Sequence, residues 1–247
     1  MGAEKTLIFG ATSAIAQQTA RLLAARGAEL FLVGRSADKL GAIAADLKVR
    51  GAAQVFARTA DLDRASEHDA ILDEAARRLG RIERVLIAHG VLGEQSAAER
   101  DFTQVERIFH TNCASTLSLL TRVAQRMSEQ GSGTIAVITS VAADRGRPSN
   151  YVYGASKAAV SVFLQGLRAR LHRRGVRVLE LKPGPVDTPM TAHMEKSWAF
   201  SRPEVIAAGI VRAFDGRRDV VYLPWFWRWI MWGIRAMPDR IFNRLTL

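Results

Sequence analysis

Residues 6–16 read Thr-Leu-Ile-Phe-Gly-Ala-Thr-Ser-Ala-Ile-Ala, an apolar run followed at once by a turn of small residues that opens a helical pattern. Strands that are buried on both faces of a parallel sheet read as short, continuous apolar runs. Small side chains after such a strand let the backbone turn tightly and bring helix N-terminal amides close to a phosphate. This unit therefore predicts the start of a parallel α/β sheet with an anion site in its first turn.

The same alternation of apolar runs and longer helical patterns continues almost to the end of the chain. The expected strands are Thr6–Phe9, Glu29–Val33, Gln54–Arg58, Arg84–Ala88, Thr134–Thr139, Arg177–Leu181 and Val220–Leu223. The expected helices include Ile15–Arg26, Asp38–Arg50, Ser66–Leu79, Phe102–Gln130, Tyr153–Arg174 and Glu204–Phe214. No linker or repeat interrupts the pattern. We therefore predict α/β architecture: one Rossmann-type domain over residues 1–247, with a doubly wound parallel sheet of about seven strands and helices on both faces.

Composition bounds the chemistry. Cys113 is the only cysteine, which excludes an intrachain disulfide and a cysteine-based metal cluster and suits a reducing, cytoplasmic compartment. The histidines show no metal-ligand spacing, so no metal is expected. The formal net charge is +11, which favours anionic partners, although a solvated basic surface explains it equally well. No basic block or zinc-finger spacing is present, and we expect no nucleic-acid partner.

The turn after the first strand predicts a dinucleotide site, with Gly10 as its glycine and Ala14 and Ala16 at the later small positions. An acidic residue after the second strand would bind the ribose of NAD, whereas a basic one suits the phosphate of NADP. Arg35 stands there without a carboxylate at the turn, so NADP(H) is favoured over NAD(H). A solvent-facing Arg35 is the alternative. Asp61, which follows the third strand, can accept a hydrogen bond from adenine or simply cap a helix.

Tyr153-Gly-Ala-Ser-Lys157 carries the strongest chemical signal. Residues at i and i+4 share a helix face, so the Lys157 ammonium is expected near the Tyr153 phenol, whose pKa of about 10 a cation would lower. Tyr151 has Ala155 at that spacing and lacks this partner. Ser140 closes an expected strand and can hydrogen-bond a substrate oxygen, while Asn112 lies within a long helical stretch. These residues predict proton exchange with a carbonyl or alcohol.

These motifs together resemble the short-chain dehydrogenases/reductases over nearly the whole chain. The matching positions are Gly10 to Ala16, Ile87-Ala-His-Gly90, Asn112, Ser140, Tyr153, Lys157 and Pro183-Gly184-Pro-Val-Asp-Thr188. The resemblance implies an Asn–Ser–Tyr–Lys catalytic tetrad: Lys157 also binds the nicotinamide ribose, Ser140 orients the carbonyl, and Asn112 completes a proton relay. The coenzyme contacts that it implies are Gly10, Thr12, Ser13, Ile15, Arg35, Asp61, Leu62, His89, Gly90, Tyr153, Lys157, Pro183, Gly184, Val186 and Thr188.

The resemblance also implies a homodimer or homotetramer, because long helices such as Phe102–Gln130 and Tyr153–Arg174 pair between subunits in this family. The chain departs from the family pattern in two places. Alanines replace two glycines of the first turn, and Ala88-His89 replaces a small/amide pair. His89 either contacts coenzyme or substrate, or is a hydrogen-bonded structural histidine.

Two further segments bear on the substrate. Residues 189–203 stand where the family has its substrate lid, and their methionines and aromatic residues favour either an apolar substrate or packing onto the core. Residues 224–247 form an aromatic and basic C-terminal segment in which Arg228 and Arg235 share a narrow polar stripe. Such a segment is typical of peripheral contact with a membrane, here at its inner face, or of a lipid-binding mouth, and a subunit contact is the alternative.

Residues 88–94, residues 151–157 and the C-terminal segment resemble one branch of the family, the decaprenylphosphoryl 2-keto-pentose reductases. This branch implies a lipid-linked keto-sugar as substrate. A generic soluble ketone or 3-oxoacyl reductase is the alternative enzyme, and a catalytically inactive cofactor-sensing protein is the alternative from another class.

Overall fold

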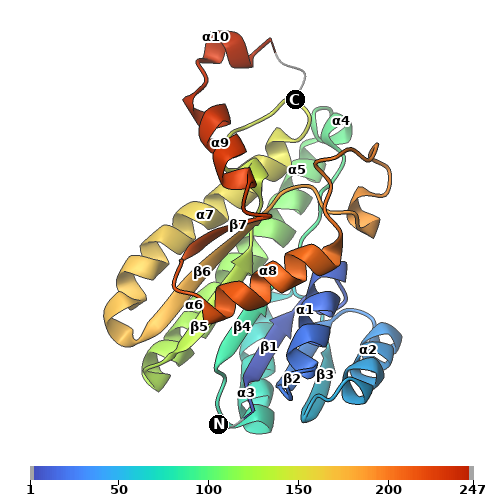
Figure 1. Ribbon diagram of the computed structural model, residues 1–247, viewed down its shortest axis with the longest axis vertical. Coiled ribbons are helices and arrows are strands. Elements are labelled where there is room, and N and C mark those ends of the chain that lie inside the picture. The colour runs from blue at the N-terminus through green and yellow to red at the C-terminus, as the bar shows by residue number, and fades with distance from the viewer. Residues whose placement is uncertain (1–2, 245–247) are drawn as a thin grey trace.

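The computed structural model describes residues 3–244, and its strands form one seven-stranded sheet in the order β3-β2-β1-β4-β5-β6-β7 (Figure 1). The strands are β1 (Lys5–Phe9), β2 (Glu29–Gly34), β3 (Gln54–Thr59), β4 (Arg84–Ile87), β5 (Gly133–Ile138), β6 (Val176–Pro183) and β7 (Val220–Leu223). Each neighbouring pair is parallel. The predicted doubly wound parallel sheet is thereby confirmed. Residues 1–2 and 245–247, the two ends of the expected domain and of the C-terminal segment, lie outside the described residues.

Helices cover both faces of the sheet, as predicted (Figure 1). The longer ones are α1 (Ala14–Ala24), α2 (Ala37–Val49), α3 (His68–Leu79), α5 (Phe102–Phe109), α6 (Ser115–Gln130), α7 (Tyr151–Leu171), α8 (Pro203–Asp215) and α9 (Trp227–Ala236). The short ones are α4 (Gln95–Ala98), α10 (Asp239–Phe242), and the single turns η1 (Ala65–Glu67), η2 (His110–Ala114), η3 (Val141–Ala143), η4 (His172–Arg174) and η5 (Pro189–Thr191). Buried residues of α3, α6 and α7 pack on one face, and those of α1, α2 and α8 on the other.

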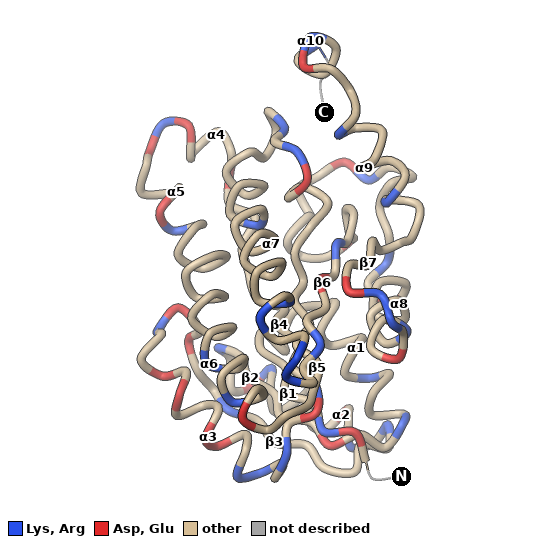
Figure 2. Tube along the Cα trace, turned by 90° about the vertical axis from the view of Figure 1, so that its left-hand side faces the viewer, with Lys and Arg blue, Asp and Glu red and all other residues tan. Residues whose placement is uncertain are grey.

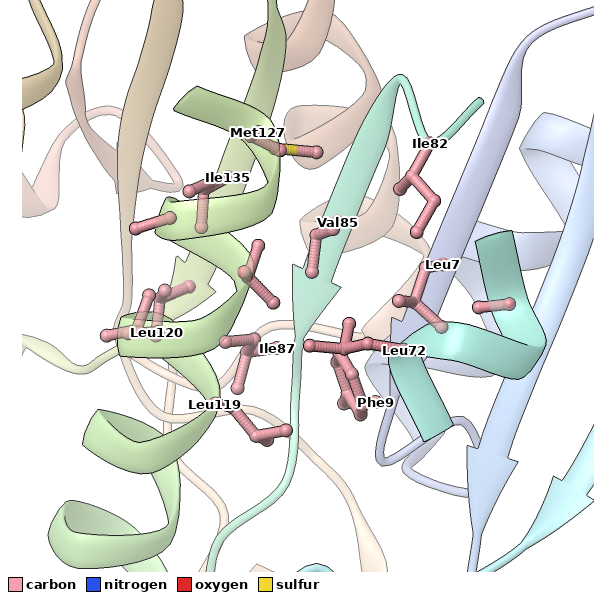
Figure 3. Packing of buried hydrophobic residues seen from close by; sticks show 14 of the residues in the cluster. Leu7, Phe9, Leu72, Ile82, Val85, Ile87, Leu119, Leu120, Met127 and Ile135 are labelled. Atoms are coloured by element: carbon pink, nitrogen blue, oxygen red, sulfur yellow. The ribbon is translucent and has the colours of Figure 1, made fainter. Parts of the chain in front are cut away.

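Successive side chains of a strand point to opposite faces of the sheet, so each strand contributes residues to two cores. In β1, Leu7 and Phe9 enter the core beneath α3 and α6, whereas Ile8 enters the core beneath α1 and α8. Figure 3 shows the first of these cores, where Leu7 and Phe9 meet Leu72 of α3 and Ile87 of β4. An unbroken apolar run is therefore what a strand between two helical layers requires.

The strand order reverses between β1 and β4, since the chain winds outward through β2 and β3 on one side and through β5 to β7 on the other. In such sheets the crevice beyond the carboxyl ends of the strands, at this switch point, is where ligands bind. The loops after β1, β2, β4, β5 and β6 all open at this edge. Apart from Asn112, and from Asp61 and Leu62, which follow β3, every predicted site residue lies in or just after one of these loops.

The helix expected over residues 102–130 is interrupted. Residues His110–Ala114 form a π-helical turn between α5 and α6. Such turns insert an extra residue into a helix and are frequent at functional sites. Asn112 lies in this turn and is fully buried.

The C-terminal segment leaves the sheet after β7 and packs back over the loop that follows β5. Trp227 and Met231, one turn apart on α9, are buried against Val141. Arg145 secures the segment, since it donates to the carbonyl oxygen of Met237 at 2.6 Å and pairs with Asp239 at 2.6 Å. Among the described helices, none has the length and apolar character needed to span a bilayer.

Candidate active site

A cleft of about 620 Å³ opens at the carboxyl edge of the sheet, between the two halves of the fold. Its size is ordinary for a small-molecule or cofactor site. The sequence-predicted residues that line it are Gly10, Thr12, Ser13, Ile15, Arg35, Asp61, Leu62, His89, Gly90, Ser140, Tyr153, Lys157, Pro183, Gly184, Val186 and Thr188. The fold thus gathers segments that are far apart in the chain. Of the residues predicted for the site, Asn112 alone does not line the cleft.

The first turn directs the N-terminus of α1 at the cleft. Gly10 has φ +73°, and a Cβ there would lie 2.6 Å from the backbone nitrogen of His89, so only glycine fits. Ser13 caps α1 by accepting from the amide of Ala16 at 3.2 Å. Ala14 lines the cleft and Ala16 is fully buried, so the two alanines are accommodated within the helix. Helix amides and a positive dipole end are the donor set that a pyrophosphate requires.

Arg35 follows β2 directly, is exposed, and lines the cleft. Ser36 caps α2 by accepting from the amide of Lys39 at 3.3 Å, so its hydroxyl is already engaged. After β3, Asp61 lines the cleft, and one of its carboxylate oxygens accepts from the amide of Asp63 at 3.2 Å. This end of the cleft is therefore lined by the Arg35 cation and by the carboxylates of Asp61 and Asp63.

His89 is a neutral histidine in the cleft wall, and one of its ring nitrogens acts as a donor. Ser115 donates its hydroxyl to the carbonyl oxygen of Leu62 at 2.5 Å, and therefore accepts from His89 Nε2 at 3.0 Å. Nδ1 of His89 is buried and has no partner among the described residues. Burial, and next the nearby Lys157 cation, lower the pKa of His89 to about 3. The side chain is hydrogen-bonded as a structural histidine while one ring nitrogen remains available to a donor.

Ser140, Tyr153 and Lys157 converge in the middle of the cleft. Ser140 follows β5 and accepts from the amide of Ala142 at 3.1 Å, and its hydroxyl is close enough to Tyr153 to influence the pKa of the phenol. Tyr153 stands in the first turn of α7 and Lys157 one turn later. Lys157 Nζ lies 5.9 Å from the centre of the Tyr153 ring and donates to the carbonyl oxygen of Ile138 at 3.2 Å. The i, i+4 spacing thus places the amine and the phenol in the same cleft.

The direction of the Tyr153 pKa differs from the expectation. Burial raises the pKa of Tyr153 to about 12, and the hydrogen bond with Ser140 opposes this rise. Burial also lowers the pKa of Lys157 to about 8. Desolvation disfavours the charged form of both groups, which accounts for the direction of both shifts. Tyr153 is therefore a protonated hydroxyl at neutral pH.

Asn112 lies behind the cleft and holds its wall together. Its Oδ1 accepts from the amide of Val91 at 2.7 Å, and its Nδ2 donates to the carbonyl oxygen of Val91 at 2.8 Å and to Ser156 Oγ at 3.1 Å. A Cβ at Gly90 would lie 2.9 Å from Asn112 Oδ1 and 3.2 Å from Lys157 Nζ, which explains a glycine at this position. The side chain of Asn112 joins the segment after β4 to α7.

The motif from Pro183 to Thr188, after β6, connects the cleft with the expected lid (residues 189–203) and with the C-terminal segment (residues 224–247). Val186 forms a bridge with Ser201, at the far end of the expected lid. Within the lid, Met190, Thr191, His193 and Met194 line the cleft, whereas Trp198 is 80% exposed. The Trp198 ring lies 6.4 Å from that of Phe226, just before α9. The expected lid and the C-terminal segment are thus in contact through these two rings.

The cleft residues that sequence reasoning missed include Arg147 and Asn150, in the loop between Ser140 and Tyr153. The signal that could have found them is their position in the sequence between Ser140 and Tyr153. It also missed Trp227, which packs on Gly184, because nothing local in the sequence indicates that contact. Among residues 3–244, no group of three or more His, Cys, Asp or Glu side chains is placed to hold a metal ion.

A doubly wound sheet whose cleft joins a helix N-terminus to a serine, a tyrosine and a buried lysine defines a class of nicotinamide-dependent oxidoreductases. The model of the short chain dehydrogenase family matches residues 4–198, and the chain belongs to this family of NAD(P)-dependent dehydrogenases and reductases.

Known relatives agree with this assignment. An uncharacterized oxidoreductase of Mycobacterium tuberculosis is 38% identical and covers 99% of this chain and 98% of its own. An uncharacterized oxidoreductase of Streptomyces coelicolor is 33% identical, with 98% and 95% covered. Among solved structures, levodione reductase is 25% identical with a TM-score of 0.79, covering 87% of this chain and 92% of its own. An actinorhodin polyketide ketoreductase variant solved with NADPH shares the fold, with a TM-score of 0.81, 24% identity, and 91% and 97% covered.

Proposed function

We propose that the protein is an NADP(H)-dependent reductase that interconverts a ketone and a secondary alcohol on an apolar or lipid-linked substrate. The observation that carries the proposal is that Ser140, Tyr153 and Lys157 line the same cleft, with Lys157 one helical turn from Tyr153. A hydroxyl pair at this place suits the oxygen of a carbonyl, which accepts two hydrogen bonds. The buried amine beside it suits a ribose hydroxyl.

The donor set fits a dinucleotide. The N-terminus of α1 would hold the pyrophosphate, Arg35 the 2′-phosphate, and Lys157 the nicotinamide ribose. The bound coenzyme would supply the hydride for reduction or accept it in oxidation. Arg35 supports NADP(H), because a guanidinium binds phosphate by charge-assisted hydrogen bonds and the turn after β2 offers no carboxylate for ribose hydroxyls.

The protein's own groups handle the proton. Ser140 donates a hydrogen bond to the substrate oxygen and orients it, and Tyr153 donates its proton to that oxygen as the carbonyl carbon is reduced. Tyr153 is protonated at neutral pH and can therefore donate this proton. Asn112 is a positioning residue, which fixes the segment after β4 behind Lys157.

Several exposed apolar side chains support an apolar or lipid-linked substrate. Met190 and Met194 line the cleft, and Trp225, Trp229 and Trp232 around α9 are 70%, 61% and 63% exposed. Arg228 and Arg235 stand on the same helix, which suits an anionic lipid surface. The keto-sugar itself rests on the resemblance of residues 88–94 and 151–157 to the decaprenylphosphoryl 2-keto-pentose reductases.

An assembly of two or four copies is part of the proposal. Figure 2 shows a long uncharged stretch on α7, and in sequence Lys157, which is buried, is the one charged residue of α7 before Arg168. Val162 on this helix is 65% exposed. An exposed helix face without charges suits contact with a second copy. Light scattering of the purified protein should therefore give a mass of two or four chains.

The test is coenzyme oxidation by the wild type and by Tyr153→Phe with a panel of ketones that includes a polyprenyl-linked keto-sugar. We expect turnover by the wild type, a loss of about 100-fold or more in kcat for the variant, and unchanged NADPH binding. A wild type that binds NADPH without oxidising it with any ketone would instead be a cofactor sensor. Turnover of soluble ketones alone would reject the lipid-linked substrate.

A further inference from the structure

The loop between Ser140 and Tyr153 carries a cation that the proposed proton transfer does not use. Arg147 lines the cleft and is half-buried. Its Nε is buried without a hydrogen-bond partner among residues 3–244. One terminal nitrogen donates to Met231 Sδ at 3.3 Å, and a thioether is only a weak acceptor. The guanidinium is therefore poorly satisfied by the protein.

No counter-ion compensates this charge among the described residues. Asp144, three residues earlier, has one carboxylate oxygen 2.5 Å from Lys182 Nζ and the other 2.7 Å from the Tyr222 hydroxyl. Arg145 on the same loop has Asp239 as its partner. Burial lowers the pKa of the Arg147 guanidinium below its ordinary value, and the Asp144 charge opposes this only in part. A partly buried cation without an anion is costly unless a ligand supplies one.

A second unsatisfied group lies on the same wall. Asn150 lines the cleft, and its Oδ1 is buried without a partner in the described part of the chain. Arg147 offers donors with positive charge, whereas Asn150 offers an acceptor. A ligand that satisfies both carries an oxyanion and a hydroxyl group close to each other.

We propose that Arg147 and Asn150 form a subsite for an oxyanion, phosphate or carboxylate, that the substrate carries beside a hydroxyl group. The proposal rests on the proposed function, since it places the anion on the substrate of the same cleft. Arg147 contacts α9 through Met231 and precedes Tyr153 by one short loop. The anion therefore binds between the proton donor and the aromatic C-terminal segment, and the apolar part of the substrate extends toward that segment.

Calorimetric titration of the coenzyme-loaded protein tests the subsite without requiring turnover. The protein is saturated with NADP⁺, or with NAD⁺ in parallel, so that the coenzyme occupies the phosphate sites near α1 and Arg35. The probes are octyl phosphate, octanoate, inorganic phosphate and, as the neutral control, octanol. Binding of octyl phosphate or octanoate would indicate that the anion is attached to the apolar part of the substrate. Binding of inorganic phosphate alone would indicate a free phosphate or a phosphate carried by a sugar.

Three variants decide the role of Arg147. In Arg147→Met we expect the anionic probe to bind at least about tenfold more weakly, and in Arg147→Lys by a smaller factor, because the charge remains and the fork of donors is lost. Arg173→Met removes the same charge in η4, just beyond the far end of α7 and about 30 Å away, and should change binding less than about twofold. Octanol binding should be the same in all four proteins.

Equal affinity of wild type and Arg147→Met for every anionic probe would overturn the proposal. If Arg147→Met fails to bind coenzyme, Asn150→Asp replaces it: a carboxylate of almost the same shape should weaken the anionic probe at least about tenfold and leave octanol unchanged. Absence of that effect also overturns the proposal. A protein that binds octyl phosphate through Arg147 but reduces no ketone would reject the proposed function and retain the subsite.

Discussion

The indole of Trp227 lies directly against Gly184, so closely that a Cβ on Gly184 would stand 2.0 Å from Trp227 Nε1. Gly184 belongs to the segment that follows β6 at the cleft, and Trp227 begins α9. Trp227 is 5% exposed and belongs to the cluster that joins α9 to the loop after β5. The C-terminal segment therefore packs directly against a residue that lines the cleft.

Gly184→Ala should therefore displace Trp227. Because the added methyl group meets a rigid ring in a packed site, we expect a loss of about 1 to 3 kcal/mol in the free energy of unfolding and a shift in tryptophan fluorescence. Gly146→Ala is the matched control, since a Cβ there meets nothing within 4 Å. Chemical denaturation measures both. The double variant Gly184→Ala/Trp227→Leu should lose less stability than the sum of the losses in the two single variants, because the smaller side chain leaves room for the methyl group. A loss in the double variant equal to that sum would contradict the contact.

The loss of the Lys157 charge should reduce ketone reduction at high pH. Its pKa of about 8 means that the ammonium is present below pH 8 and is lost as the pH rises through that value. Tyr153, with a pKa of about 12, stays protonated throughout. We expect kcat/KM for ketone reduction to fall above pH 8. In Lys157→Arg the guanidinium stays charged, so any activity that this variant keeps should show no such fall; an identical fall would assign the loss to another group.

The same burial makes Lys157 a cost to stability at neutral pH. The folded-state pKa of about 8 lies below the ordinary 10.5, so the folded state binds fewer protons than the unfolded chain between these values. The penalty is complete below pH 8 and disappears as the pH approaches 10.5. After allowing for the lost hydrogen bond to Ile138, Lys157→Met should stabilise the protein by about 2 kcal/mol at pH 7. Thermal unfolding at pH 7 and pH 10 should show this gain at pH 7 and little at pH 10.

Arg35 should decide between the two coenzymes. Arg35→Ser removes the cation beside the expected 2′-phosphate, so KM for NADPH should rise about tenfold or more while KM for NADH changes little. Lys48→Met, which removes an exposed charge near the other end of α2, is the control for long-range electrostatics. Steady-state kinetics with both coenzymes gives the comparison. Equal changes with NADPH and NADH would mean that Arg35 contacts a part common to both.

The sheet was predictable because β1, β2 and β4 each carry a continuous apolar run, which a strand buried on both faces of a sheet requires. The Tyr153–Lys157 pair was predictable because one helical turn separates them. The pKa of Tyr153 was not, since spacing gives proximity and says nothing about desolvation. The π-turn at Asn112 and the contact of Trp227 with Gly184 depend on packing between distant segments, which no local pattern reports.

The exposed tryptophans of α9 should bind an anionic lipid surface. Trp229 and Trp232 lie on the side of the helix away from the buried Trp227 and Met231, and basic residues flank them. We expect the variant Trp229→Ala/Trp232→Ala to bind phosphatidylglycerol vesicles at least about tenfold more weakly in a flotation assay, because two large rings no longer enter the interface. Phe102→Ala, a 70% exposed aromatic residue on α5, is the matched control and should bind as the wild type does. Wild-type protein that ignores these vesicles, yet loses its oligomeric state when Trp229 and Trp232 are replaced, would make α9 a subunit interface instead.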